Sequence, residues 1–490
     1  MPDAYYRIAA NKSEADSSLY QHARLTKSLS TLAPQRKDNV PTFKDIRLTH
    51  RFPLKQDYKP IVLLSNDIVE HTTNTGKFVT EYKGDTQGQM YMKTHITAGA
   101  VDAVLTQYYT FQYCENFVPA LINKINFKVN ADHVCSIPGA ALFVYSRVYV
   151  TPNMRPGLMR LWKETVVTLK YGVGMPLNPA AQAAYTVAIT SFTANMPHTP
   201  LNAPAFAKPA FDLYIPLDII TTAKGVDNPF PTAALHNLER TVEFEYNTIT
   251  DYINVIGADD GGGIWEYVNP SNATWLSTPS ISSTVLYVNY ILVHRDLQKI
   301  MALNGAAYVI RQFEADEVIV TNADRRELSY TKVIDSIAII ARYYRNTTRV
   351  ETGSTITINL VAINTEYAID PFFLPMDTNP ISTINVLARG QVFYQNKTWD
   401  ELSAVFPYIF GSDQSSAPLD RSLAMVTFNQ KLTDRDLFST YNSGYGPNVT
   451  IQWGTTAFGT TDATKGAIIF IVIAVNVIAA YRGVMSIRYI

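Results

Sequence analysis

One stretch near the middle of the chain, residues 284–314, separates two long segments that have the character of β-sequence. Residues 285–293 are almost all β-branched, aromatic or leucine, which predicts a buried strand. After it, Asp296 can cap a short helix and Gly305 can end it in a left-handed conformation. Residues 308–313 are again strand-like. We therefore expect a strand–helix–strand joint between two all-β halves.

Both halves consist of short β-rich runs with Gly, Pro and Asn between them. Before the joint the expected strands are 58–64, 104–113, 121–129, 142–150, 165–171, 211–220 and 242–246; after it they are 317–321, 333–344, 355–363, 381–394, 422–428, 448–453 and 468–489. No comparable helix is predicted elsewhere. Many short strands with turn residues between them are typical of antiparallel sandwiches, of which the jelly roll is the usual large form.

Three further segments have distinct expectations. Residues 172–209 are rich in Ala, Thr, Pro and Asn, and we expect a long surface loop there, with another loop insertion over residues 259–283. Gly466–Tyr481 is nearly all apolar but is shorter than a membrane-spanning helix and contains Asn476. Its Ile and Val content predicts a buried central strand.

The composition indicates what the chain buries rather than what it binds. At 490 residues two domains are expected, and the net charge of −1 indicates no general attraction to nucleic acid or membranes. Charged residues make up 17%, against about 25% in ordinary soluble proteins. Either much of the surface is buried against other chains, or the protein has a large β core; both interpretations stay open at this point.

The first 40 residues form a polar arm. Between Ser17 and Lys37 the arm carries basic residues and no acidic one, and these are the candidate assembly contacts, Arg24, Lys27, Arg36 and Lys37. The arm is either a floppy terminus or a segment that orders against a neighbouring subunit or an internal component.

No pattern of a catalytic or metal site is found. The eight histidines lack metal-ligand spacing, and the sequence contains neither a phosphate-binding loop nor a nucleophile elbow. Cys114 and Cys135 are expected to be free core thiols in a reducing compartment. We therefore expect no enzyme activity, no cofactor and no metal.

Five motifs in a fixed order resemble those of the double jelly-roll major capsid proteins of nucleocytoplasmic large DNA viruses, virophages and polinton-like viruses. They are Phe117–Ile125; Ile215-Pro216-Leu217 with Pro231–Leu235 and Val242-Glu243-Phe244; the joint Tyr287–Ala302 with Tyr308–Ile310; Ile334–Tyr343; and Asn442–Asn448 with Ala474–Ile478 and Gly483. The sequence departs from the family pattern at His294–Leu297, at the start of the strand after the joint, and in the closing Ser-Gly-Tyr-Gly-Pro-Asn.

The resemblance implies two consecutive eight-stranded antiparallel jelly rolls joined by a short helix, with an N-terminal arm and long loops. The domain boundaries expected on this basis are an arm at 1–42, a first roll at 43–295, a joining helix at 296–307 and a second roll at 308–490. The resemblance also implies a major capsid protein that forms homotrimeric, pseudo-hexameric capsomers. These would tile an icosahedral virion shell around double-stranded DNA, assembled inside the host cell.

The partners implied are other copies of the chain, penton and minor capsid proteins, and an internal membrane or the genome, reached through the arm. Two alternatives remain. A lectin-like or carbohydrate-active β-sandwich protein would need an aromatic platform, and the five tryptophans are scattered along the chain. A minor capsid protein or a capsid-derived scaffold would share the fold.

Overall fold

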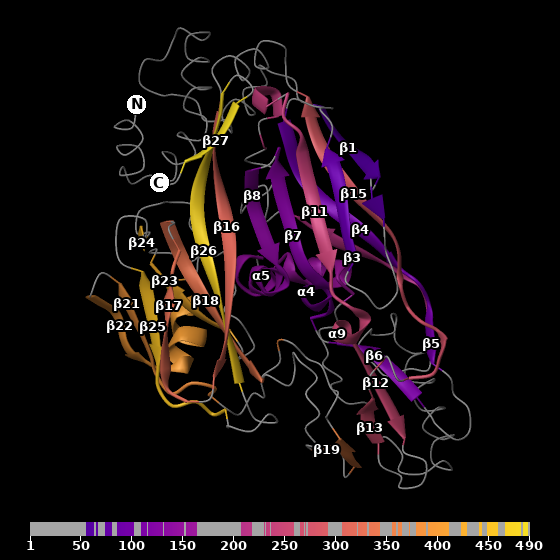
Figure 1. Ribbon diagram of the computed structural model, residues 1–490, viewed down its shortest axis with the longest axis vertical. Coiled ribbons are helices and arrows are strands. Elements are labelled where there is room, and N and C mark those ends of the chain that lie inside the picture. Colours follow the sequence, from indigo (N-terminus) through magenta and orange to yellow (C-terminus); the bar gives the residue numbers. More distant parts are fainter. Residues whose placement is uncertain are drawn as a thin grey trace.

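The computed structural model places two β-sandwiches side by side, with their strands running roughly along the long axis of the molecule (Figure 1). The residues it describes are 55–62, 65–66, 74–80, 86–101, 109–114, 116–130, 132–150, 153–163, 207–217, 230, 232–235, 237–258, 265–268, 270, 273–292, 306–320, 322–330, 333–343, 355–358, 361–364, 372, 379–388, 391–410, 423–428, 441–442, 448–458, 466–481 and 484–488. The arm and residues 293–305 of the expected joint lie outside these ranges.

The first sandwich is built from two antiparallel sheets that face each other. One sheet has the order β1-β15-β4-β10, and the other has the order β3-β11-β7-β8, extended by the short strand β2 (Ser65–Asn66). The bounds are β1 (Lys55–Val62), β3 (Asn74–Thr80), β4 (Thr86–Ile96), β7 (Ile122–Val129), β8 (Asp132–Pro138), β10 (Phe211–Pro216), β11 (Arg240–Tyr246) and β15 (Ile281–Leu292).

The second sandwich repeats this plan. Its sheets have the orders β16-β26-β18-β23 and β17-β25-β21-β22. The bounds are β16 (Ala306–Val320), β17 (Asp324–Leu328), β18 (Val333–Tyr343), β21 (Ile384–Ala388), β22 (Gln391–Lys397), β23 (Leu423–Thr427), β25 (Val449–Trp453) and β26 (Gly466–Tyr481). Two small strands flank it, with β24 (Tyr441–Asn442) on β18 and β27 (Val484–Arg488) on β26.

The strand order is the same in both sandwiches. If these eight strands of each half are numbered in chain order, one sheet reads 1-8-3-6 and the other 2-7-4-5. Strand 1 therefore pairs with strand 8, 2 with 7, 3 with 6 and 4 with 5. These pairs form one long hairpin, which is rolled up into two sheets. This topology is the jelly roll, and the prediction of two consecutive eight-stranded jelly rolls is confirmed. We call them the first and second roll.

Loops of both rolls form two further sheets beyond the ends of the main strands (Figure 1). A five-stranded sheet contains β19-β20-β13-β12-β6, and a three-stranded one contains β14-β5-β9. Their bounds are β5 (Gly99–Val101), β6 (Tyr109–Tyr113), β9 (Ala207–Lys208), β12 (Ile253–Ala258), β13 (Trp265–Val268), β14 (Trp275–Ser277), β19 (Thr355–Ile358) and β20 (Val361–Asn364). Strands β13 and β14 and the start of β15 thus lie inside the expected loop at 259–283. Of the loop expected at 172–209, residues 172–206 lie outside the described ranges.

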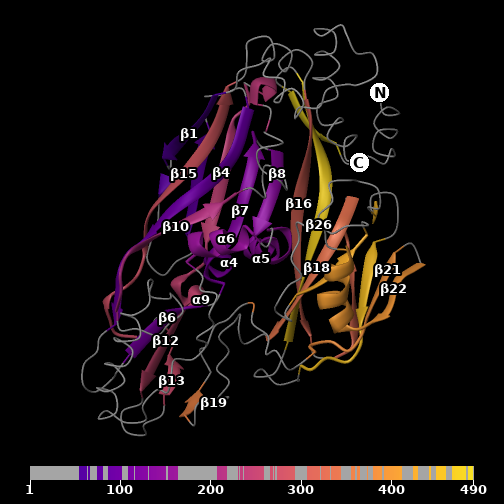
Figure 2. The same ribbon diagram turned by 180° about the vertical axis from the view of Figure 1, so that it is seen from behind.

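Several short helices connect the strands of the rolls. They are α4 (Phe117–Leu121), α5 (Gly139–Val144), the π-helix η1 (Tyr145–Tyr149), α6 (Arg155–Leu161), η3 (Thr232–Leu235), α9 (Ile249–Tyr252), the π-helix η4 (Glu401–Val405) and α12 (Phe406–Phe410). Figure 2 shows α4, α5 and α6 grouped at one end of the first roll.

Two sequence predictions are wrong here. Residues 142–150 were expected to form a strand, and α5 with η1 occupies this segment instead. Gly139 allows this helix to begin directly against the preceding chain, since a Cβ at that position would collide with the carbonyl oxygens of Pro119 and Ile122. Tertiary packing therefore overrides the strand propensity of the valines and tyrosines. Phe117–Leu121, in the first motif of the resemblance, is also a helix rather than a strand.

The joint also differs at its end. Ala306 and Ala307, which were assigned to the joining helix, are the first residues of β16.

Candidate functional site

In the described part of the molecule, the two rolls pack against each other through many buried side chains. In one sheet of the second roll, β16-β26-β18-β23, the strands β26, β18 and β23 are buried on both faces. One face packs into the second roll's own core, through Ile337, Ile339, Ala424, Val426, Ile468, Phe470 and Val472. The opposite face belongs to the core of the first roll, through Ala338, Ile340, Leu423, Met425, Ile469, Ile471 and Ile473.

This double burial explains the unbroken apolar run of β26. A strand with one solvent-exposed face alternates apolar and polar residues, whereas a strand that is buried on both faces has a continuous run of apolar residues. The prediction that Gly466–Tyr481 forms a buried central strand is confirmed, because β26 lies between β16 and β18 and residues 466–476 are buried.

The first roll contributes α5 and η1 to this seam, and Figure 1 shows α5 between the two rolls. Phe143 of α5 stacks on Phe372, which follows β18 in the second roll, with ring centroids 4.7 Å apart and an interplanar angle of 9°. At the end of η1, the Tyr149 hydroxyl lies 3.4 Å from the Ser336 hydroxyl. The Arg311 guanidinium lies 4.9 Å from the centre of the Tyr149 ring. Burial raises the pKa of Tyr149 to about 12, so its hydroxyl keeps its proton at neutral pH.

Beside the helix, the edge strand β8 runs against the edge strand β16. The Gln312 side chain donates to the Val134 carbonyl over 2.8 Å, and the Cys135 thiol donates to the Arg311 carbonyl over 3.2 Å. Asn476, the polar residue in the apolar run, donates to the Gln312 side-chain oxygen over 3.3 Å and so orients the Gln312 amide. Buried polar groups of this kind specify one arrangement, since a shifted register would leave them unpaired.

A charged group also lies in the seam. Arg342 is buried on β18, donates to Glu317 over 2.8 Å, and has its guanidinium 6.0 Å from the ring centre of Phe372. Burial lowers the pKa of Arg342, and the Glu317 carboxylate opposes this effect. An arginine nevertheless stays protonated in proteins, so the seam contains a charge-assisted hydrogen bond.

The loop sheets connect the rolls a second time. Strand β13 of the first roll pairs in parallel with β20 of the second, with Trp265 opposite Ile363 and Glu266 opposite Asn364. The relative placement of the rolls is therefore held at the loop end as well as along the seam.

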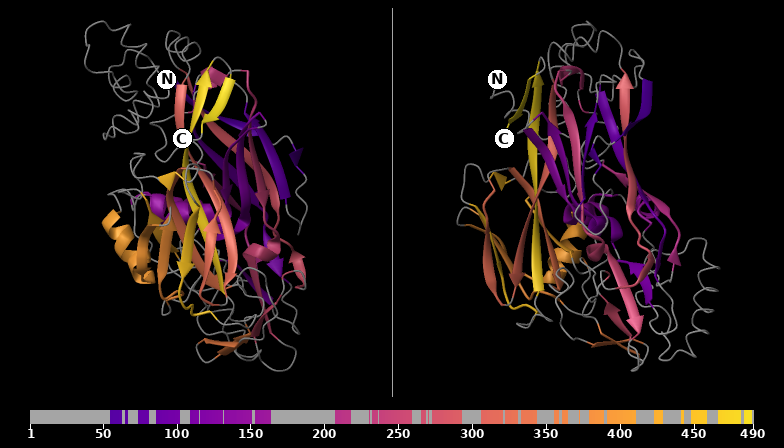
Figure 3. Two further views of the ribbon diagram at one scale, coloured as in Figure 1. Left: turned by 60° about the vertical axis from the view of Figure 1, so that its left-hand side comes forward. Right: turned by 45° about the vertical axis from the view of Figure 1, so that its right-hand side comes forward.

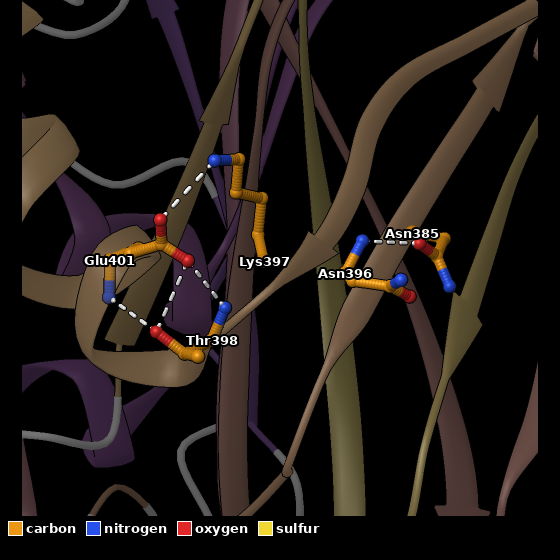
Figure 4. A network of polar contacts seen from close by, with 5 residues as sticks. All are labelled: Asn385, Asn396, Lys397, Thr398 and Glu401. Carbon is orange, nitrogen blue, oxygen red and sulfur yellow. Dashed lines mark hydrogen bonds and ion pairs between the residues drawn. The ribbon is translucent and has the colours of Figure 1, made fainter.

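The second roll has its own helix at the position of α5. In each roll a helical segment follows the fifth strand, which is β8 in the first roll and β22 in the second. In the second roll it begins with a capping box, in which the Thr398 hydroxyl accepts from the Glu401 amide over 3.3 Å and the Glu401 carboxylate accepts from the Thr398 amide over 2.8 Å (Figure 4). Lys397 pairs with Glu401 at 3.2 Å, and the Asn396 amide donates to Asn385 over 2.5 Å.

This second helix carries an apolar stripe that points away from its own roll. Trp399 and Leu402 are buried in the core of the second roll. On the other side Val405 is 44% exposed, Tyr408 83% and Ile409 61%. Its start was recognisable in the sequence as Thr-Trp-Asp-Glu before an apolar run, the pattern of a capping box, and was missed.

Comparison with known proteins supports the fold. No family model matches the chain, and no curated protein matches it. Among solved structures, the Faustovirus major capsid protein aligns with a TM-score of 0.62 at 14% identity, covering 95% of this chain and 99% of that one. The PBCV-1 virus capsid model aligns with a TM-score of 0.63 at 12% identity, covering 89% and 98%. The chain has the double jelly-roll fold.

A third solved structure, the Sputnik virophage determined by cryo-EM, aligns with a TM-score of 0.52 at 11% identity, covering 89% of this chain and 88% of that one. The likeness therefore extends over both rolls of the double jelly roll, which agrees with the repeated strand order.

The structure does not place the four residues that the sequence offered as assembly contacts. Arg24, Lys27, Arg36 and Lys37 lie outside the described residues. Cys114 and Cys135 are buried and are not joined in a disulfide, as expected for core thiols. Within the described ranges no group of His, Cys, Asp and Glu side chains is arranged to hold a metal ion. No helix in those ranges has the length and apolar character needed to cross a membrane.

Proposed function

We propose that this protein is a major capsid protein, whose work is association with copies of itself into the shell of an icosahedral virus with double-stranded DNA. The observation that carries this proposal is the fixed pairing of two jelly rolls with one strand order in one chain. The likeness in fold to the Faustovirus and PBCV-1 capsid proteins over nearly the whole chain supports it. Among the described residues, the two rolls share an extended apolar seam, and no group of side chains is arranged to hold a metal ion.

The oligomer that we propose is a homotrimer. Each chain supplies two similar rolls that stand side by side with parallel long axes (Figure 3). Three chains then supply six rolls, and a ring of six has the pseudo-hexagonal outline that tiles a flat lattice. A closed ring of identical chains needs only one type of contact between neighbours.

Further partners follow from the same proposal. Capsomers contact one another, penton proteins fill the fivefold positions, and minor capsid proteins bind between capsomers. The basic arm, with Arg24, Lys27, Arg36 and Lys37, reaches an internal membrane or the genome. The protein would then reside in the virion shell after assembly in the host cell.

Negative-stain electron microscopy of the purified protein, together with light scattering on a sizing column, tests the proposal. The expected result is compact particles of three chains with a hexagonal outline, or closed shells. Well-folded single particles of one chain at micromolar concentration would contradict it, and a glycan-binding screen would then examine the lectin-like alternative.

A further inference from the structure

The helix that follows the fifth strand has two different environments in the two rolls. In the first roll, α5 and η1 are covered by the second roll, and residues such as Phe143 and Val144 are fully buried. In the second roll, η4 and α12 expose an apolar stripe of Ala404, Val405, Tyr408 and Ile409, in which no side chain is charged. We call this surface the helix face. Monomeric soluble proteins seldom leave such contiguous apolar surface uncovered when it has no role.

The neighbouring edge strand differs in the same way. In the first roll, β8 lies against β16, and Val134 and Cys135 are buried there. In the second roll, β22 is also the edge strand of its sheet, but Val392 is 51% exposed and Phe393 49%. An edge strand with exposed apolar residues favours association with another chain. The helix face and β22 together therefore repeat the half of the seam that the first roll supplies.

The first roll also carries a surface that repeats the half of the seam supplied by the second roll. Its sheet β1-β15-β4-β10 corresponds in strand order to β16-β26-β18-β23, whose outer face receives α5 in the seam. The outer face of the first roll's sheet carries Tyr91, Tyr214 and Tyr287, all half-buried, and we call it the tyrosine face. Tyr91 stacks on Tyr287 with ring centroids 4.8 Å apart, and the ring of Tyr214 lies 6.2 Å from that of Tyr91.

Charged groups lie among these rings. Asp212 contacts Lys93 at 2.9 Å and His95 at 2.7 Å, and the Lys93 amine lies 5.8 Å from the centre of the Tyr214 ring. Tyrosines held rigid by stacking and rimmed by paired charges are characteristic of protein–protein interfaces. The tyrosine face thus offers a surface on which a helix with an uncharged apolar stripe can pack.

We propose that the helix face of one copy docks on the tyrosine face of a second copy, in the same way that α5 docks on the second roll within one chain. This inference rests on the proposed trimer and assigns the surfaces that form it. The contact is heterologous, so each chain has one helix face and one tyrosine face to share, and repetition of the contact closes a ring. The internal seam and the contact between copies then alternate around that ring.

The test uses one variant for each face in the full-length chain. Tyr408→Asp/Ile409→Asp alters the helix face, and Tyr91→Asp alters the tyrosine face. Each places a charge in the proposed contact, which is expected to weaken association by about a hundredfold or more, because central aromatic anchors carry most of the binding energy. Each variant alone should run as a monomer by light scattering at concentrations where the unaltered protein is a trimer. Leu276→Asp is the control, since Leu276 is 71% exposed and lies on neither face.

Mixing the two variants gives the sharper result. The intact helix face of the Tyr91 variant can bind the intact tyrosine face of the Tyr408/Ile409 variant, and the two altered faces then remain at the ends. A one-to-one heterodimer that grows no further is therefore expected. Trimers formed by the folded helix-face variant alone would overturn the proposal, as would the absence of the heterodimer when both variants keep the near-ultraviolet circular dichroism of the unaltered protein.

Two arms keep the outcomes separate. If the Tyr408→Asp/Ile409→Asp variant fails to fold, Tyr408→Ala/Ile409→Ala replaces it, since both side chains are mostly exposed and their truncation leaves the core intact. Trimer formation by that variant as strong as that of the unaltered protein would overturn the docking proposal. If the unaltered protein itself forms no trimer, the proposed function fails first. If it forms trimers that neither face affects, only the assignment of these surfaces fails.

Discussion

Lys208 is the residue whose burial has the clearest consequence for pH dependence. It lies in β9, is 3% exposed, and has its amine 5.9 Å from the centre of the Phe111 ring. Burial lowers its pKa to about 7. The unfolded chain therefore binds a proton at this lysine more tightly than the folded protein does, and the resulting destabilisation is greatest at and below about pH 7. It fades as the pH rises toward the ordinary lysine pKa of about 10.4.

Lys208→Met is accordingly expected to raise the free energy of unfolding by about 1–3 kcal/mol at pH 7, because the methionine removes the cost of burying the charged form. The gain should shrink at pH 10. Urea unfolding at the two pH values measures this difference. An equal gain at both would show that packing, rather than protonation, is responsible.

Single residues in the seam could be predicted only in part. The apolar run 466–481 indicated a buried strand, and Asn476 within it ruled against a simple lipid-facing segment. Asn476 orients Gln312, which lies 164 positions away along the chain, and Gln312 donates to Val134, which lies 178 positions away. Pairings between distant residues have no signal in one sequence, so these contacts could not be predicted.

At the scale of elements, α5 shows how a strand-like sequence becomes a helix. Its residues pack between the first roll and the double-buried sheet, and Phe143 stacks on Phe372. Strand β11, in which apolar and polar residues alternate, and strand β26, in which β-branched residues are continuous, were predicted, whereas β3, β4 and β8 were not. Helices of one or two turns were missed, because such short segments show too few repeats for their periodicity to be recognised.

Phe143→Ala should lower the free energy of unfolding by about 3–5 kcal/mol, since it leaves a cavity beneath a stacked ring in a fully buried place. Hydrogen exchange in β16 and β18 should accelerate with it, because these strands form the other wall of the seam. Urea unfolding and exchange measured by mass spectrometry check both effects.

Leu276→Ala serves as the matched truncation, since its side chain is mostly exposed and a change within about 0.5 kcal/mol is expected. If Phe143→Ala cost no more than this control, the seam would not depend on the stacked rings.

On the scale of the whole molecule, the two-roll architecture could be predicted from strand count, turn spacing and the five resembling motifs. The strand order of each roll and the packing of one roll on the other could not, because topology depends on which distant strands pair. The low fraction of charged residues was compatible with a large β core or with a surface that is buried against other chains. The sheet between the two rolls supports the first interpretation, and the exposed helix face supports the second.

Removal of residues 1–40 is expected to leave capsomers intact and to impair shell assembly, because the basic stretch with Arg24 and Lys27 lies before the first strand of the first roll. Electron microscopy of the truncated protein beside the full-length protein under assembly conditions measures both steps. Shells of normal yield from the truncated protein would show that the arm has no part in assembly.

The sheet that is buried on both faces also has a consequence for the order of events during folding. In this sheet β16 and β26 are neighbours, but the other strands of the second roll lie between them in the sequence. Strand β26, which completes the sheet, is therefore synthesised long after β16. Until β26 arrives, one edge of β18 lacks its partner strand, and pairings between such distant segments form slowly. The first roll, whose eight strands precede β16, can meanwhile present α5 as a template. An early-folding half would thus act as an internal chaperone for the later one.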